Sequence, residues 1–153
     1  MSDLLVLTDE QKKILQNTAI ACLGIDYVFG QKAADLGMEP AKIKGIDCSG
    51  YVRYLYHKAG LVIPDGSGEQ YINTLPVDVP AVGDVVFKSI NGHIDHIGGI
   101  FEAENGLILV SEASGSLGHV VIRDLWSFKT FPKNVDFAGV RRFIADKVKA
   151  VSL

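Results

Sequence analysis

Cysteine is scarce in this sequence, and neither sign of charge dominates it. The 153 residues include only two cysteines, Cys22 and Cys48. Two cysteines do not make the disulfide framework of a small secreted protein, and no CxxC pair offers the ordinary spacing of a zinc site. The net charge of −3 excludes the basic footprint of a nucleic-acid-binding protein. No apolar run reaches the ~18 residues of a membrane span.

The N-terminal segment also lacks the features of a signal peptide. Residues 1–10 have no basic start, and their apolar run is too short. We therefore expect synthesis in the cytoplasm, with some other route if the protein acts outside the cell. The length predicts one domain, 1–153, and no internal repeat or low-complexity segment interrupts it.

Helical and extended patterns are separated along the chain. A capping box at 8–11 predicts a helix to about Cys22, with Cys22 on its core face. Further helices are expected at 47–60 and, capped by Ser67 with Gln70, at 67–75. Strands are expected at 84–88, 96–101, 107–113, 119–122 and 138–144, with an Asn105-Gly106 hairpin turn. This order predicts an α+β fold, with N-terminal helices packed on a mostly antiparallel sheet of five to six strands.

The helix that begins at Cys48 is the most informative stretch. Asp47 is a good N-cap, and Gly60 is a good stop. The apolar residues on the Cys48 face are Val52, Leu55 and Ala59. The positive end of the helix dipole favours a thiolate, whereas the neighbouring Asp47 carboxylate disfavours it. The position suits a nucleophile that still needs a base, and a small buried hydrophobe is the alternative interpretation.

The four histidines are the candidates for that base. His57 lies on the opposite side of the helix from Cys48, and we expect it at the surface. His93 falls in or just after a turn. His96 begins a strand and shares a face with Gly98. Strand glycines often mark a close approach of another backbone, which we expect here from the Cys48 helix. An ordinary hydrogen-bonded polar residue is the alternative for His96.

Glu112 is a candidate for orienting the imidazole. It shares a strand face with Ile108 and Val110, where a carboxylate is costly unless it is paired. A short hairpin allows a register that brings Glu112 to His96, whose tautomer it would fix. A solvent-facing strand end is the alternative. His119 is a second candidate for the orienting role, or a surface residue.

A zinc site is a further alternative. Its ligands would be Cys48, His93, His96 and His119. One HxxH spacing is the only pattern that supports it.

Four short motifs resemble those of the NlpC-type cell-wall cysteine peptidases, which are compact papain-like hydrolases of bacteria and phages. DCSGYV at 47–52 resembles the nucleophile motif, and PAVGDVVF at 80–87 resembles a Pro-x-x-Gly-Asp element before a strand. HIGGI at 96–100 resembles the histidine strand, and YVFG at 27–30 resembles an upstream Tyr-x-Trp-Gly element. The order and spacing agree with the family, so the resemblance implies a papain-like fold.

The resemblance also implies a role for individual residues. Cys48 matches the nucleophile, and His96 matches the base. Tyr27 matches a tyrosine that lines the active site. Asp47 and Ser49 match positions near the amino group of the substrate.

The family's third polar residue is most often a histidine in a His-Ala-Ser segment. Here Glu112-Ala113-Ser114 occupies that place. Glu112 is therefore the best match, although it departs from the commonest residue type. A carboxylate orients an imidazole at least as well.

The activity that the resemblance implies is hydrolysis of amide bonds in peptidoglycan stem peptides, often between D-γ-glutamyl and meso-diaminopimelate. No metal or organic cofactor is needed. Two alternatives stay open: a related amidase or acyltransferase with another substrate, and a non-catalytic wall-binding module. Without a signal peptide, we expect delivery by a phage or a specialised secretion route, where an immunity or inhibitor protein would be a partner, or action on recycled wall peptides in the cytoplasm.

Overall fold

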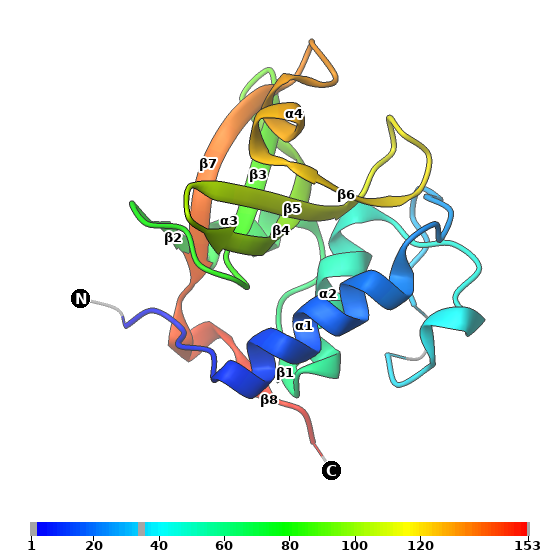
Figure 1. Ribbon diagram of the computed structural model, residues 1–153, viewed down its shortest axis with the longest axis vertical. Helices are drawn as coiled ribbons and strands as arrows, with labels where there is room; N and C mark the ends of the chain where they lie inside the picture. Colours follow the sequence, from blue (N-terminus) through cyan, green and yellow to red (C-terminus); the bar gives the residue numbers. More distant parts are fainter. Residues whose placement is uncertain (1–2, 34–35, 153) are drawn as a thin grey trace.

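Helices cover both faces of one six-stranded sheet (Figure 1). The computed structural model describes residues 3–33 and 36–152. The helices are α1 (Asp9–Cys22), α2 (Cys48–Lys58), α3 (Ser67–Ile72) and α4 (Leu125–Thr130), with short 3-10 helices at η1 (Pro40–Lys42) and η2 (Ala145–Lys147). The strands are β1 (Leu61–Val62), β2 (Thr74–Pro76), β3 (Val85–Ile90), β4 (His93–Glu104), β5 (Leu107–Ala113), β6 (Val120–Asp124), β7 (Asp136–Phe143) and β8 (Lys149–Ala150).

The two long helices begin at the caps that the sequence predicts. Thr8 Oγ1 accepts a hydrogen bond from the Gln11 N–H at 3.0 Å, and the Gln11 side chain accepts one from the Thr8 N–H at 2.9 Å. Asp47 caps α2 by accepting from the Gly50 N–H at 2.7 Å. Cys22 is 0% exposed, which confirms it as a core residue. Local sequence therefore sets where both helices start.

The sheet has the strand order β2-β7-β3-β4-β5-β6, and each neighbouring pair is antiparallel. Asn105 and Gly106 join β4 to β5 with φ angles of 53° and 80°. Positive φ at both positions is what a tight hairpin turn requires, and it suits an Asn-Gly pair. Strands β1 and β8 form a separate pair. The predicted α+β class and mostly antiparallel sheet are confirmed.

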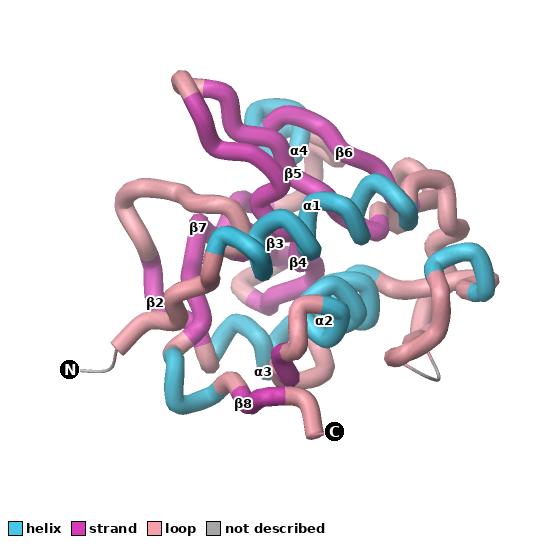
Figure 2. The backbone as a smooth tube through the Cα atoms, turned by 60° about the horizontal axis from the view of Figure 1, so that its bottom comes forward, coloured by secondary structure: helices cyan, strands magenta, loops and turns pink. Residues whose placement is uncertain are grey.

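The two faces of the sheet pack against different helices. Helices α1 and α2 lie side by side on one face (Figure 1 and Figure 2), where Val52 and Phe87 belong to the larger core cluster. On the other face, α4 contributes Phe128 to a smaller cluster with Val86 and Val110. Residues that alternate along β3 and β5 therefore face different helices, as the strand period requires.

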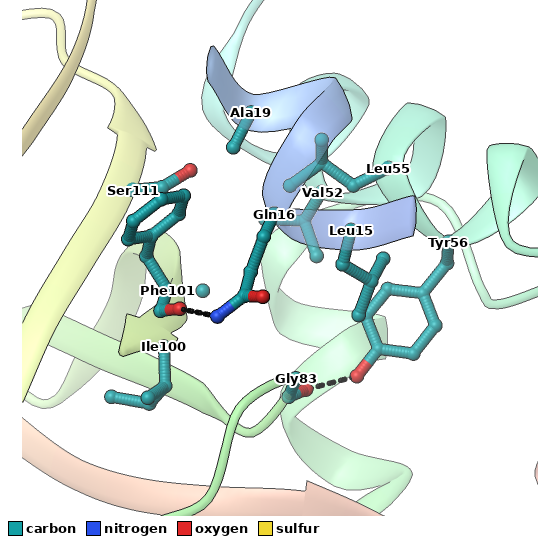
Figure 3. A pocket seen from close by; sticks show the side chains of 11 residues that line it. Leu15, Gln16, Ala19, Val52, Leu55, Tyr56, Gly83, Ile100, Phe101 and Ser111 are labelled. Atoms are coloured by element: carbon teal, nitrogen blue, oxygen red, sulfur yellow. Dashed lines mark hydrogen bonds between the residues drawn. The ribbon is translucent and has the colours of Figure 1, made fainter. Parts of the chain in front are cut away.

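A small apolar cavity lies where α1 and α2 meet β4 and β5 (Figure 3). Gln16 reaches from α1 and donates from Nε2 to the Phe101 carbonyl at 2.9 Å (Figure 3). Tyr56 of α2 donates its hydroxyl hydrogen to the Gly83 carbonyl, just before β3 (Figure 3). Tyr51, one turn after the start of α2, bonds with the Ser111 hydroxyl on β5. These bonds fix α1 and α2 relative to the sheet.

The predicted cap of α3 is wrong. Gly66 precedes the helix, with no side-chain hydrogen bond at the cap, and the helix ends at Ile72. Gln70 is instead 0% exposed and donates to the carbonyls of Ser49 and Pro64 at 3.2 and 2.9 Å. Its amide is used in tertiary bonds that hold α3 against the start of α2.

The explanation predicted for Gly98 is also wrong. A Cβ at Gly98 would lie 2.8 Å from Val110 Cγ1 and 3.2 Å from Phe128 Cε1. The close approach therefore comes from β5 and α4, not from the Cys48 helix. Helix α4 itself was not predicted, because it has only six residues. Its one clear signal is the N-cap Asp124, which accepts from the Ser127 N–H at 2.8 Å.

Candidate active site

Cys48 is the first residue of α2 and is 7% exposed. The predicted packing face of this helix is confirmed, since Val52, Leu55 and Ala59 are all buried. The first N–H groups of a helix have no partner within it. Here the Asp47 side chain takes the Gly50 N–H, and the N–H groups of Cys48 and Ser49 precede it at the positive end of the helix. The sulfur thus lies at the positive end of the helix dipole.

Lys32 offsets the negative charge beside Cys48. Its ammonium lies 2.8 and 2.7 Å from the two Asp47 carboxylate oxygens and 2.7 Å from Ser49 Oγ. It also lies 3.4 Å from Asp65. The negative charge of Asp47 beside Cys48 is therefore largely compensated. Asp47 and Ser49 thus hold the Lys32 ammonium together.

His96 lies on β4 between Cys48 and Glu112. Its Nε2 is 2.9 Å from Glu112 Oε1, and its ring also interacts with the Cys48 side chain. The ring stacks on Phe128 at 5.7 Å between centroids. Burial by itself would lower the pKa of His96, but the hydrogen bonds and negative charges of Cys48 and Glu112 raise it to about 9. The imidazole is therefore held as a cation at neutral pH.

Glu112 is 0% exposed, and its carboxylate pairs with two cationic side chains, His96 and Arg123. Besides His96, it accepts from Arg123 Nε at 2.7 Å and from Arg123 Nη2 at 3.2 Å. Burial would raise the pKa of Glu112, but the bonds to His96 and Arg123 lower it below its usual value. The predicted approach of Glu112 to His96 is what the structure shows. A solvent-facing position for Glu112 is excluded.

Tyr27 is half-buried and lines the same cavity as His96 and Glu112. Burial, followed by the negative charges of Cys48, Asp47 and Asp95, raises the pKa of Tyr27 to about 12, so its phenol stays protonated. Its ring lies close to Gly115, where a Cβ would be 3.3 Å from Tyr27 Cε1. The loop after β5 therefore packs against the ring.

The other histidines lie apart from this arrangement. His93 and His119 are exposed, and His57 is partly exposed on the side of α2 away from the sulfur. The backbone of His119 pairs with Asp26. Within 3–33 and 36–152, no group of three or more histidine, cysteine, aspartate or glutamate side chains is arranged to hold a metal ion.

A cavity of about 210 Å³ lies beside His96 and Glu112. Its lining combines aromatic, hydroxyl and charged side chains, among them Tyr27, Phe29, Lys88, Asp95, Ser114 and Ser116. Cys48 is not in the lining, but its partner His96 is. The cavity gives a polar ligand access to the imidazole.

Four residues of the site were not predicted from the sequence: Lys32, Lys88, Arg123 and Phe128. Lys88 is opposite His96 on β3, donates to the Phe131 carbonyl at 2.9 Å and lies 4.1 Å from the centre of the Phe128 ring. Burial lowers the pKa of Lys88 to about 8. Only the alternation of β6 could have placed Arg123 on the Glu112 face.

A family model described as the NlpC/P60 family matches residues 24–130, more than half of the chain. The chain belongs to the NlpC/P60 family. The predicted membership is thereby confirmed, and the two motifs that contain Cys48 and His96 lie inside the matched region. The predicted papain-like fold is confirmed by the solved structures of the family. No helix in the described part of the chain is long and apolar enough to cross a membrane.

Two relatives carry names that describe peptidases. The chain is 35% identical over 71 residues to "Probable endopeptidase p60" of Listeria monocytogenes, covering 45% of this chain and 14% of that protein. It is 35% identical over 109 residues to "Peptidoglycan endopeptidase RipB" of Mycobacterium tuberculosis, covering 65% of this chain and 42% of that protein. The chain thus spans less than half the length of either NlpC/P60 relative.

Solved structures of the NlpC/P60 family share the fold. The P60 domain of an antigen from M. avium subspecies paratuberculosis matches with a TM-score of 0.65 at 27% identity, covering 89% of this chain and 96% of that one. RipD of M. tuberculosis, described as a non-catalytic domain adapted to peptidoglycan binding, matches with a TM-score of 0.61 at 16% identity, covering 90% and 99%. The likeness to RipD shows the fold alone.

Proposed function

We propose that this protein is a cysteine hydrolase that cleaves amide bonds in peptidoglycan stem peptides, of the γ-D-glutamyl–diaminopimelate type. The observation that carries the proposal is the continuous set of side-chain contacts from Cys48 through His96 to Glu112. A nucleophile, a base and an orienting carboxylate in this order are what amide hydrolysis requires. The peptidoglycan endopeptidase name of RipB supports the choice of substrate.

The geometry suggests how acylation would proceed. The Cys48 thiolate attacks the carbonyl carbon, and the developing oxyanion is stabilised by N–H groups at the start of α2, those of Cys48 or Ser49. The imidazolium of His96 gives its proton to the leaving amine, so the amide bond breaks and a thioester forms on Cys48. The raised pKa of His96 keeps this proton available at neutral pH.

Deacylation uses the same residues, but His96 now accepts a proton instead of donating one. Neutral His96 takes a proton from water, and the resulting hydroxide attacks the thioester carbonyl. The tetrahedral intermediate collapses by breaking the C–S bond, and the product acid releases its proton to solvent and leaves as a carboxylate, so the thiolate–imidazolium pair is restored. Throughout, Glu112 accepts a hydrogen bond from Nε2 of His96, so Nδ1 is the nitrogen that exchanges the proton beside the Cys48 sulfur.

Tyr27, Asp47 and Ser49 are proposed to contact the substrate. Asp47 and Ser49 already bind the Lys32 ammonium, so these acceptors are preorganised for a positively charged amine. A substrate amine that used them would displace Lys32 or share its acceptors. Tyr27 remains a neutral phenol that donates a hydrogen bond.

The test is incubation with purified peptidoglycan stem peptides, followed by mass spectrometry of the products. We expect the wild-type protein to release fragments that identify the cut bond, and Cys48→Ala to release none. Intact stem peptides after incubation with wild-type protein would overturn the proposed substrate. Binding of those peptides without cleavage would then favour a wall-binding role, whereas cleavage of other amides would favour a related amidase.

A further inference from the structure

Arg123 makes a two-pronged ion pair with Glu112 and has no part in the reaction as derived above. We propose that Arg123 is a positioning residue that acts through Glu112 to orient His96 and to limit how strongly the imidazole holds its proton. The inference rests on the proposed function of Cys48 and His96. It adds a fourth residue, on β6, to a site otherwise built from α2, β4 and β5.

The geometry of the carboxylate is the first argument. Glu112 Oε2 accepts from Arg123 Nε at 2.7 Å, and Oε1 accepts from both Arg123 Nη2 at 3.2 Å and His96 Nε2 at 2.9 Å. A planar guanidinium that holds both oxygens fixes the plane of the carboxylate. The oxygen that bonds to His96 therefore cannot rotate away from the ring.

The anchoring of Arg123 is the second argument. Its Nη1 donates to the Ser127 carbonyl at 3.2 Å, and its Nη2 donates to the Phe131 carbonyl at 3.0 Å. The guanidinium lies 5.7 Å from the centre of the Phe128 ring, which also stacks on His96. Its side chain is only 12% exposed. Helix α4 thus holds the guanidinium from one side while Glu112 holds it from the other.

Charge is the third argument. A fully buried carboxylate is costly unless it is paired, and Glu112 is kept ionised by Arg123 together with the imidazolium of His96. Without Arg123, His96 alone would pair with the carboxylate and would hold its proton more tightly. The positive charge of Arg123 also repels the imidazolium of His96, so it restrains a pKa that an unshared glutamate would raise further. His96 can then release its proton to the leaving amine more readily.

Several other charged or titratable groups surround His96 and Glu112. These are Cys48 from α2, Lys88 from β3, Asp95 from β4 and Tyr27 from the segment before α2. The test therefore changes Arg123 alone and leaves each of these groups in place.

The experiment compares wild type with Arg123→Gln, which keeps length and polarity but removes the charge. We expect kcat on stem peptides to fall by about tenfold to a hundredfold with little change in KM, because the base is misplaced and not the substrate. The descending limb of the pH profile should move to higher pH. The pKa of His96, followed by its ring 15N resonances, should rise in the same direction without any need for substrate.

The matched control is Arg142→Gln. Arg142 also forms a two-pronged pair with a buried carboxylate, Asp84, at 2.6 and 2.8 Å. Losing that pair should lower the melting temperature but leave the pH profile and the His96 resonances as in wild type. A purely structural role for Arg123 predicts the same pattern for Arg123→Gln, and that outcome would overturn the proposal.

Two further outcomes are distinguishable. If Arg123→Gln does not fold, Arg123→Lys decides, because lysine keeps the charge but not the two parallel bonds; wild-type kcat in that variant would overturn the proposal. If wild-type protein cleaves no stem peptide, the proposed function fails. The His96 resonances still show whether Arg123 sets its pKa and tautomer, and an unchanged pKa in Arg123→Gln overturns the positioning role separately.

Discussion

Cys22 and Cys48 lie against the same core cluster but at opposite ends of their helices. Cys22 is the last residue of α1, at the negative end of a helix dipole, and burial raises its pKa to about 11. Cys48 is the first residue of α2, at the positive end, and its side chain interacts with His96. Both thiols are nearly inaccessible to solvent. The comparison teaches that helix polarity and a partner imidazole, more than exposure, distinguish the proposed nucleophile Cys48 from the structural thiol Cys22.

The largest expected difference between the two cysteines is the loss of turnover when each is replaced by alanine. Cys48→Ala should lower hydrolysis by about a thousandfold or more, since it removes the sulfur that is proposed to form the thioester. Cys22→Ala should keep a rate close to wild type and lose about 1 kcal/mol of unfolding free energy, because a small buried group is removed. Stem-peptide cleavage and chemical denaturation measure the two effects. Equal losses of activity would end the distinction between the two cysteines.

The second test removes the support behind the imidazole. Glu112→Ala should lower kcat by about a hundredfold, because His96 loses the partner that fixes its tautomer. His119→Ala is the matched change at an exposed histidine, and its kcat should remain near wild type. Both values come from the same cleavage assay. A larger loss in His119→Ala would transfer the orienting role to that residue.

The third test measures thiol reactivity without a substrate. Iodoacetamide near neutral pH should label Cys48 about tenfold faster than Cys22 or more, because only a thiolate reacts and Cys22 with a pKa of about 11 is almost wholly protonated. His96→Ala should slow the labelling of Cys48 and leave Cys22 unchanged. Mass spectrometry of tryptic peptides gives both rates. Equal labelling of the two thiols would contradict the assignment of Cys48 as nucleophile.

The smallest effect is the pH dependence of stability. The pKa of His96 is raised from 6.5 to about 9 in the folded protein. The stabilisation from its charged form is therefore complete below pH 6.5 and is lost as the pH rises through about 9. The difference in unfolding free energy between wild type and His96→Gln should shrink over that range. A difference that grew with pH would mean that His96 is neutral in the folded state. Cys22→Ala serves as a control that leaves His96 and Glu112 unchanged.

Sequence periodicity and caps were sufficient for the parts of the fold that depend on local signals. The capping box at Thr8, the Asp47 cap and the Asn105-Gly106 turn each lie where predicted. Gln70 was misread because a Ser67–Gln70 spacing satisfies a capping pattern, whereas a tertiary bond to the Ser49 carbonyl decides its position.

In the candidate site, only the contacts that follow from strand alternation and a short hairpin could be predicted from the sequence. Adjacent strands joined by a hairpin brought His96 and Glu112 together, as expected. Arg123 and Phe128 were not foreseen, because their contacts depend on the pairing of β5 with β6 and on a six-residue helix with weak periodicity. Lys32 comes from an irregular segment, where no period predicts which way a side chain points.

His96, Glu112 and Arg123 occupy three adjacent strands, and this placement bears on how the folded state can be monitored. A slip of one residue between two strands turns every side chain of the moved strand to the opposite face while preserving most backbone bonds. Such a misaligned sheet would give a native-like circular dichroism spectrum, yet Glu112 would lose at least one of its partners. If the proposed function holds, turnover is a reporter of correct strand register, and specific activity would measure refolding quality more stringently than secondary-structure content does.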